Sequence, residues 1–346
     1  MSFVLHYIWY DINDNFRSKT KVFDGKINDI NDVPEWNYDG SSTGQALGKN
    51  SEIILKPVFM CKDPFRKNLN SYLVLCNTKN RDNALEIFIK YKDTKPWFGL
   101  EQEYFIIDNN TNKPFGFSDN IDIGKTCVEK QCFSIHDYCL FTNKNIVFSS
   151  KKGNYYCGIG SKYAIKRNIS ELHLEYCLYA GLKISGINAE VAPAQWEYQI
   201  GPVEGIEACD QLLMSRFILL YIAELDNCNI SFHPKLLDNY NGSGCHTNFS
   251  NHNIRTLGIS EINKAMEKLE ENHFLHMENY GNFNELRMTG IHETSSFHKF
   301  SWGIGDRSCS IRIPTDISKN PYFEDRRPAA NMDPYLVCSL IVKTIN

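Results

Sequence analysis

Glutamate residues that could hold a divalent cation stand close together in residues 97–108. This run is rich in aromatic and β-branched side chains, which predicts a strand. Side chains alternate between the two faces of a strand, so Glu101, Glu103 and Phe105 share one face. Two carboxylates roughly 7 Å apart on one face repel each other unless a cation lies between or above them. Taken alone, the pair also fits a solvated strand face.

Two further acids, Glu190 and Glu197, lie in residues 188–202. Their odd spacing would put them on opposite faces of one continuous strand. Pro193 and the small residues around it predict a break, where a hairpin or a bulge turns both carboxylates inward. The alternative interpretation is two unrelated acids at the surface.

A glycine-rich segment, residues 241–250, leads into His246. Glycine lets the backbone approach a ligand closely. A single histidine is more often structural than a metal ligand. One histidine together with four or five acids nevertheless suits two hard divalent cations, and such oxygen-rich sites favour Mg²⁺ or Mn²⁺ over a structural zinc.

Arginine becomes frequent toward the C-terminal end, at positions 287, 307, 312, 326 and 327, with Glu324 close to the last two. Guanidinium groups match carboxylate and phosphate oxygens, although each arginine alone fits a salt-bridged surface equally well. Carboxylates for metal and arginines for anions together predict a site for a nucleoside triphosphate. The chain has no Walker A sequence and no GxGxxG, so neither a P-loop nor a Rossmann site is indicated.

The elements that must position these residues mix strands and helices without regular alternation, which predicts an α+β fold. We expect strands at residues 4–9, 72–76 and 97–108, and helices at residues 84–91, 170–183, 204–227 and 260–280. Ser260 is the expected N-cap of the last helix. Its 346 residues predict about two domains, with a boundary in the polar stretch 77–83. Residues 117–150 lack periodicity and predict a surface insertion.

Composition excludes several classes of protein. The net charge of −4 argues against a globally basic nucleic-acid binder. The first residues resemble no secretory signal, and no apolar run is long enough to span a bilayer. We therefore expect a cytoplasmic protein with no nucleic-acid or membrane partner, in which the 12 cysteines are free thiols.

Together these segments resemble the glutamine synthetase family, and more closely its eukaryotic-type branch. The resemblance covers nearly the whole chain, and its blocks follow the family order: residues 35–43, 63–67, 97–104, 155–160, 188–202, 241–250, 289–295, 306–314 and 322–334.

The resemblance implies an architecture and a metal site. Residues 1–79 would form a small β-grasp-like domain. Residues 80–346 would form the larger catalytic domain, with a curved antiparallel sheet and flanking helices. The site would hold two to three Mg²⁺ or Mn²⁺ ions. The first ion would be bound by Glu103, Glu190 and Glu197, and the second by Glu101, His246 and Glu324.

The resemblance also implies substrate contacts. Glutamate would be held by Glu190, Asn241, Gly242, Arg287 and Arg326. ATP would be held by Glu101, Asn248, Ser250, Arg307, Arg312 and Tyr322. Ammonium would be held by Asp39, Ser42, Tyr156 and Glu293. The catalytic set within these residues would be Asp39, Glu293, Arg307 and Arg326.

The implied reaction is glutamate–ammonia ligation in two steps. ATP phosphorylates the γ-carboxylate of glutamate, and ammonia then attacks the γ-glutamyl phosphate to give glutamine. Asp39 would remove a proton from ammonium, and Glu293 would help to keep water out. The family resemblance implies a homo-oligomeric ring, expected to be a decamer, in which Asp39 completes the site of a neighbouring subunit.

Three alternatives remain open. A relative that ligates glutamate to another amine would use the same activation chemistry with a different nucleophile pocket. A noncatalytic structural member would lose metal carboxylates or phosphate arginines, yet all of these are present. An ATP-guanido phosphotransferase would need no ammonium pocket.

Overall fold

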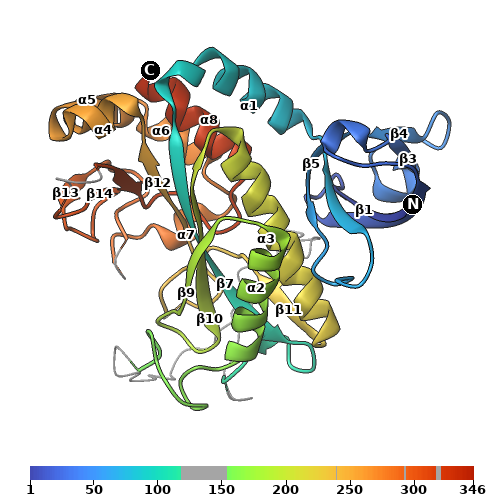
Figure 1. The fold of residues 1–346 in the computed structure, drawn as a ribbon. Coiled ribbons are helices and arrows are strands. Elements are labelled where there is room, and N and C mark those ends of the chain that lie inside the picture. Colours follow the sequence, from blue (N-terminus) through green and yellow to red (C-terminus); the bar gives the residue numbers. More distant parts are fainter. Residues whose placement is uncertain (118–153, 239, 292–293, 317–320) are drawn as a thin grey trace.

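The computed structural model describes residues 1–117, 154–238, 240–291, 294–316 and 321–346 (Figure 1). Residues 118–150 of the expected insertion lie outside the described residues. Several sheets and separate helices make up the fold, and the predicted α+β class is confirmed.

The N-terminal residues form a four-stranded sheet in the order β2-β1-β6-β5. Its strands are β1 (Ser2–Tyr10), β2 (Phe16–Asp24), β5 (Pro57–Lys62) and β6 (Ser71–Cys76). A separate two-stranded sheet pairs β3 (Trp36–Asp39) with β4 (Glu52–Leu55). Leu5, Tyr7 and Val74 belong to an apolar cluster that fills the space between these sheets and contains only residues from this part of the chain.

A nine-stranded sheet forms the centre of the molecule, with β7 in its middle. The strands follow the order β13-β14-β15-β12-β7-β10-β9, and β8 and β11 also pair with β7. Within this sheet, every described pairing is antiparallel except that of β13 with β14. The bounds are β7 (Trp97–Asp108), β8 (Lys113–Pro114), β9 (Ile184–Ala189), β10 (Gln195–Glu204), β11 (Cys228–Ser231), β12 (Cys245–Ser250), β13 (Trp302–Ile304), β14 (Ile311–Ile313) and β15 (Phe323–Asp325).

The helices are α1 (Lys79–Lys90), α2 (Arg167–Ala180), α3 (Ile206–Leu225), α4 (His252–Leu257), α5 (Ile259–Glu271), α6 (His273–Asn279), α7 (Asn284–Arg287) and α8 (Pro334–Ile345). The long α3 packs on β7 and β10 and is itself flanked by α2 and α8 (Figure 1). Leu100, Tyr104 and Ile106 of β7 are fully buried in this core. Strand alternation therefore assigns these side chains to the core and Glu101 and Glu103 to the other face.

The predicted elements exist, but some boundaries were wrong. The helix expected at 84–91 begins earlier, at Lys79, after the Thr78 cap. The helix expected at 260–280 is two helices, α5 and α6, which meet at Asn272. The Asn272 side chain donates to the carbonyl of Lys268, and such side-chain bonds compete with a continuous helix. Ser260 does not cap α5, because its hydroxyl donates to the carbonyl of Leu257 and Gly258 precedes the helix.

The structure bears on two predictions made from the composition, those about cysteines and about membrane-spanning segments. The nine cysteines among the described residues are free. Within the described ranges, no helix combines the length and the apolar character needed to cross a bilayer.

Arg216 of α3 forms hydrogen bonds with the segment that follows β15. Its guanidinium donates to Gln102 Oε1 at 2.7 Å and to the carbonyls of Met332 and Ala330 at 2.9 and 3.0 Å. Gln102 Nε2 donates to the same Ala330 carbonyl at 2.9 Å. All of these bonds are buried, so each acceptor would be costly to leave without a partner.

We expect Arg216→Met to lower stability by about 3 kcal/mol, because it leaves buried acceptors unpaired. Thermal denaturation followed by circular dichroism measures the effect. Lys264→Met is the matched control, since the Lys264 side chain is 67% exposed and its ion pair with Glu261 lies at the surface. Equal melting temperatures for the two variants would contradict the assigned role of Arg216.

Candidate active site

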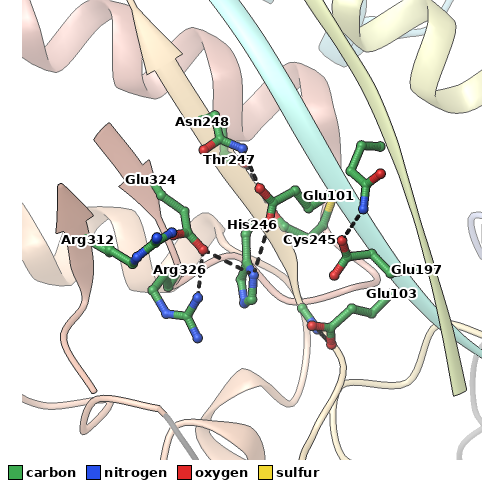
Figure 2. Close-up of polar contacts among 12 residues, drawn as sticks. Glu101, Glu103, Glu197, Cys245, His246, Thr247, Asn248, Arg312, Glu324 and Arg326 are labelled. Carbon is green, nitrogen blue, oxygen red and sulfur yellow. Dashed lines mark hydrogen bonds and ion pairs between the residues drawn. The ribbon is translucent and has the colours of Figure 1, made fainter. Parts of the chain in front are cut away.

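The register of four strands brings the predicted metal ligands together on one face of the central sheet. Glu103 of β7 lies opposite Glu197 of β10. Glu101 of β7 lies opposite His246 of β12. On the far side of β12, Glu324 of β15 pairs with Asn248. Strands far apart in sequence thus place their acids side by side (Figure 2).

The first cluster consists of Glu103, Glu190 and Glu197, whose ligand oxygens all lie within 4.8 Å of one another. The predicted break is present, and of the two expected forms it is a hairpin: β9 ends at Ala189, the antiparallel β10 begins at Gln195, and Glu190 stands in the turn between them. Glu190 and Glu197 can therefore point the same way despite their odd spacing, because Glu190 lies outside β10 and does not follow the alternation of its side chains.

Each carboxylate of this first cluster accepts a hydrogen bond. Glu103 Oε2 accepts from the Gly244 backbone N–H at 2.7 Å. Glu190 Oε1 accepts from Asn188 Nδ2 at 3.0 Å, and Glu197 accepts from Gln199 Nε2. These donors orient the oxygens toward a common point, yet neutral donors do not cancel three negative charges.

Burial, followed by repulsion from neighbouring carboxylates, raises the pKa of all three carboxyl groups to about 8. Burial is the largest cause for each. Glu190 raises the pKa of Glu103, and Glu197 raises that of Glu190. A divalent cation would favour the ionised forms and relieve this repulsion.

The second cluster consists of Glu101, His246 and Glu324. His246 Nδ1 lies 3.5 Å from both Glu101 Oε2 and Glu324 Oε1. Burial, followed by the positive charge of Arg326, holds the pKa of His246 well below its ordinary value. A neutral imidazole between two carboxylates is the form that binds a metal ion.

Arginines border the second cluster. Arg312 and Arg326 donate to the two oxygens of Glu324 at 2.8 and 2.6 Å (Figure 2). Arg312 is placed by β14, where it pairs with Glu324 across the sheet. Arg307 is exposed, and its charge acts on the pKa of both His246 and Tyr156.

The glycine-rich segment lies against Arg287. A Cβ on Gly242 would stand 2.4 Å from Arg287 Cγ, and one on Gly244 would stand 2.9 Å from His246 Nε2. Only glycine allows such close approach. Arg287 is buried, and its NH2 group donates to three consecutive carbonyls, those of residues 326, 327 and 328. Burial lowers the pKa of this guanidinium to about 10, which leaves it charged at neutral pH.

A cavity of about 480 Å³ adjoins the second cluster. Four of the predicted ATP contacts line it: Glu101, Asn248, Ser250 and Tyr322. Asn248 also donates to Glu101 Oε1 at 2.8 Å, which links the cavity to the acids.

The cavity contains two residues that sequence reasoning missed, Trp97 and Arg255. The Arg255 guanidinium lies 4.1 Å from the centre of the Trp97 ring, and this pair forms a flat cationic and aromatic wall. Trp97 opens the predicted strand and could have been suspected from that position. No pattern in the sequence links Arg255 to it.

The remaining predicted substrate contacts differ in where the structure places them. Burial is the main cause that raises the pKa of Tyr156, and the charges of Cys157, Glu190 and Glu197 raise it further. The effect of the two glutamates indicates that Tyr156 lies near the first cluster. Asn241 precedes the close-packed Gly242. The structure does not bring Asp39 and Ser42 to the clusters, because β3 lies in the N-terminal part, well away from β7 and β12 (Figure 1). Glu293 lies outside the described residues.

Asp39 has its own surroundings. Its carboxylate is exposed and accepts hydrogen bonds from the hydroxyls of Ser41 and Ser42 at 2.7 and 2.8 Å. Those bonds, with that of Ser51, hold its pKa far below the ordinary value. Within one chain, this ionised group faces solvent.

The chain is similar to known proteins over almost its full length. The family model for the catalytic domain of glutamine synthetase matches residues 81–258. A putative glutamine synthetase of Acanthamoeba polyphaga mimivirus is 47% identical to this chain. The alignment covers 99% of this chain and 94% of the length of the viral protein. Glutamine synthetase of Schizosaccharomyces pombe is 44% identical, over 98% of this chain and 90% of its own.

The fold is also similar to a solved structure. A cryo-EM structure of Plasmodium falciparum glutamine synthetase superposes with a TM-score of 0.70 and covers 99% of this chain and 71% of its own, at 18% identity. At that identity the likeness concerns the fold alone. The sequence relatives carry the assignment, and by their identity and coverage the chain belongs to the glutamine synthetase family.

Proposed function

We propose that this protein is a glutamate–ammonia ligase, which uses ATP to join ammonia to the γ-carboxylate of L-glutamate and releases glutamine, ADP and phosphate. Membership of the glutamine synthetase family is the observation that carries the proposal. The acids, arginines and cavity of the candidate site supply the groups that this reaction needs.

Two to three Mg²⁺ or Mn²⁺ ions are the proposed cofactors. The donor sets fit hard divalent cations, since they offer carboxylate oxygens and one neutral imidazole. The proposed ligands are Glu103, Glu190 and Glu197 for one ion and Glu101, His246 and Glu324 for another. When bound, the ions neutralise charge on the ATP phosphates and on the transferred group. The residues around them bind and orient the substrates.

The 480 Å³ cavity is the proposed site for ATP. The base would stack near Trp97, Arg255 and Tyr322, while Asn248 and Ser250 contact the nucleotide. Arg307 and Arg312 would meet the phosphates, because guanidinium groups match their oxygens. Glu101 lines the cavity, so an ion held by Glu101, His246 and Glu324 would lie beside it and would favour the binding of the phosphates there.

Glutamate is proposed to lie beside the glycine-rich segment. Arg287 and Arg326 would hold carboxylate oxygens, and Glu190, Asn241 and the backbone of Gly242 would contact the amino-acid part. The γ-carboxylate oxygen then attacks the γ-phosphorus of ATP, and ADP departs. The resulting acyl phosphate has a leaving group that an unactivated carboxylate lacks.

Ammonium is proposed to bind among Tyr156, Glu293, Asp39 and Ser42. Negative groups favour the cation, and Asp39 accepts the proton that ammonium loses. Ammonia then attacks the acyl carbon, and phosphate departs. Because Asp39 and Ser42 lie away from the clusters of their own chain, we propose that they complete the site of a neighbouring copy in a ring, expected to be a decamer.

Two further expectations remain proposals. The division into domains at residues 79 and 80 is consistent with the separate apolar cluster of the N-terminal part. A cytoplasmic location is the other.

The activity itself is the first test. We expect the purified protein to release phosphate from ATP only with glutamate, Mg²⁺ and ammonium present, with one glutamine formed per phosphate. The assay is run on protein whose size is checked by light scattering, against a panel of amines. Turnover with another amine and none with ammonium would favour the alternative ligase. An assembled protein that binds no nucleotide would favour a structural role.

The raised pKa values predict that metal affinity depends on pH. Because their pKa values are raised, Glu103, Glu190 and Glu197 retain protons at a higher pH than ordinary carboxyl groups when no metal is bound, and a cation must displace those protons. Affinity for Mn²⁺, measured by electron paramagnetic resonance, should therefore rise from pH 6 to pH 8, by about tenfold per pH unit for each proton released. Glu103→Gln removes one titrating group and should flatten the slope. An affinity that is constant over this range would contradict the account.

The shared site predicts complementation between inactive variants. Asp39→Ala and Glu103→Gln should each abolish glutamine formation. When the two are dissociated, mixed in equal amounts and reassembled, about a quarter of the sites should combine an intact Asp39 from one copy with an intact Glu103 from the next. Activity near that fraction is expected. A mixture as inactive as its components would show that both residues serve the same chain's site.

A further inference from the structure

Behind the strand that carries Glu324 and Arg326 lies a buried ionic pair outside the candidate site. Asp325 and Arg327 alternate with those two residues along the chain, and both are fully buried. The Arg327 guanidinium donates to Asp325 twice, from Nε at 2.9 Å and from NH2 at 2.7 Å. The pair is therefore fixed in a bidentate geometry on the back of the site strand.

His273, the first residue of α6, is held between this pair and a distant backbone segment. Its Nδ1 lies 3.2 Å from Arg327 NH1, and its Nε2 lies 3.0 Å from the carbonyl oxygen of Phe297. A guanidinium only donates, so Nδ1 must accept. The ring proton then stands on Nε2, where it donates to the carbonyl. One neutral tautomer satisfies both contacts.

Each of the two partners of His273 is hydrogen-bonded to Arg287 or to the residue that follows it. The Arg327 carbonyl accepts from Arg287 NH2 at 2.7 Å and from Asn284 Nδ2 at 2.7 Å. On the other side, the Phe297 N–H donates at 2.8 Å to the carbonyl of Met288, the residue that follows Arg287. The imidazole thus connects the two backbone segments between which Arg287 is held.

We infer that His273 is a positioning residue for glutamate binding: through Arg327 and Phe297 it fixes the backbone that aims Arg287. This deepens the proposed function and rests on it, because the role of Arg287 toward glutamate is part of that proposal. His273 touches no substrate in this assignment. Burial and the charge of Arg327 hold its pKa below the ordinary value, which is consistent with a neutral ring.

The test compares two substitutions at one position. His273→Phe keeps an aromatic ring against Phe274 and Phe300 but removes both ring nitrogens. We expect about a tenfold rise in KM for glutamate, equal to 1.4 kcal/mol, with KM for ATP nearly unchanged. His273→Gln offers an acceptor and a donor and should restore the glutamate KM. His298→Phe, at a neighbouring exposed histidine, is the control and should behave as wild type.

Hydrogen–deuterium exchange gives a readout that needs no activity. Amides of residues 294–300 should exchange faster in His273→Phe and at the wild-type rate in His273→Gln. A folded His273→Phe with wild-type exchange and wild-type glutamate KM would overturn the inference. An equal rise in both KM values, or failure of His273→Gln to rescue, would do the same.

If His273→Phe does not fold, the wild-type protein still decides the question. Solid-state NMR of protein labelled with ¹⁵N-histidine should detect a neutral His273 protonated at Nε2, and the opposite tautomer or a charged ring would overturn the inference. Wild-type protein that makes no glutamine, yet shows the expected tautomer and exchange, would refute the proposed function and leave the contacts of His273 standing.

Discussion

Repulsion among buried carboxylates on one face of the central sheet is the constraint around which the molecule is arranged. Glu103 of β7 and Glu197 of β10 stand opposite each other on neighbouring strands, with Glu190 close to both, and backbone pairing prevents the two strands from moving apart. Folding forces them together because the opposite face of the same strands carries the apolar core. The free energy of core packing opposes the repulsion, and a divalent cation would remove it.

Strand alternation sorts the charges into two sets with different roles. On β15, Glu324 faces the second cluster, while its neighbour Asp325 faces the back and pairs with Arg327. The front set is incompletely compensated and is suited to binding ions and substrates. The back set is fully paired, so it can hold the strand in place without competing for ligands. Stability and chemistry are thus assigned to adjacent residues on opposite faces.

Local patterns in the sequence predicted the parts of this arrangement that depend on near neighbours. Alternation placed Glu101 and Glu103 on one face, and Pro193 indicated the turn that brings Glu190 beside Glu197. The pairing of β12 with β7, which supplies His246, joins segments about 150 residues apart and has no local signature. Only the family resemblance gave that group of ligands in advance.

Other features escaped because their causes are tertiary or depend on one side chain. The contact of Arg255 with Trp97 follows from the position of α4 beside the cavity, and the break between α5 and α6 lies at Asn272, whose side chain donates to the carbonyl of Lys268. The position of Asp39 carries a different lesson. The family resemblance implied a role for it in the site, yet the structure of one chain places β3 well away from β7 and β12.

The most direct test of the central claim is anomalous diffraction from crystals of the full chain grown with saturating Mn²⁺. The account predicts one manganese peak among Glu103, Glu190 and Glu197 and another among Glu101, His246 and Glu324. Absence of manganese from both clusters under these conditions would contradict it, because these clusters are the assigned metal sites.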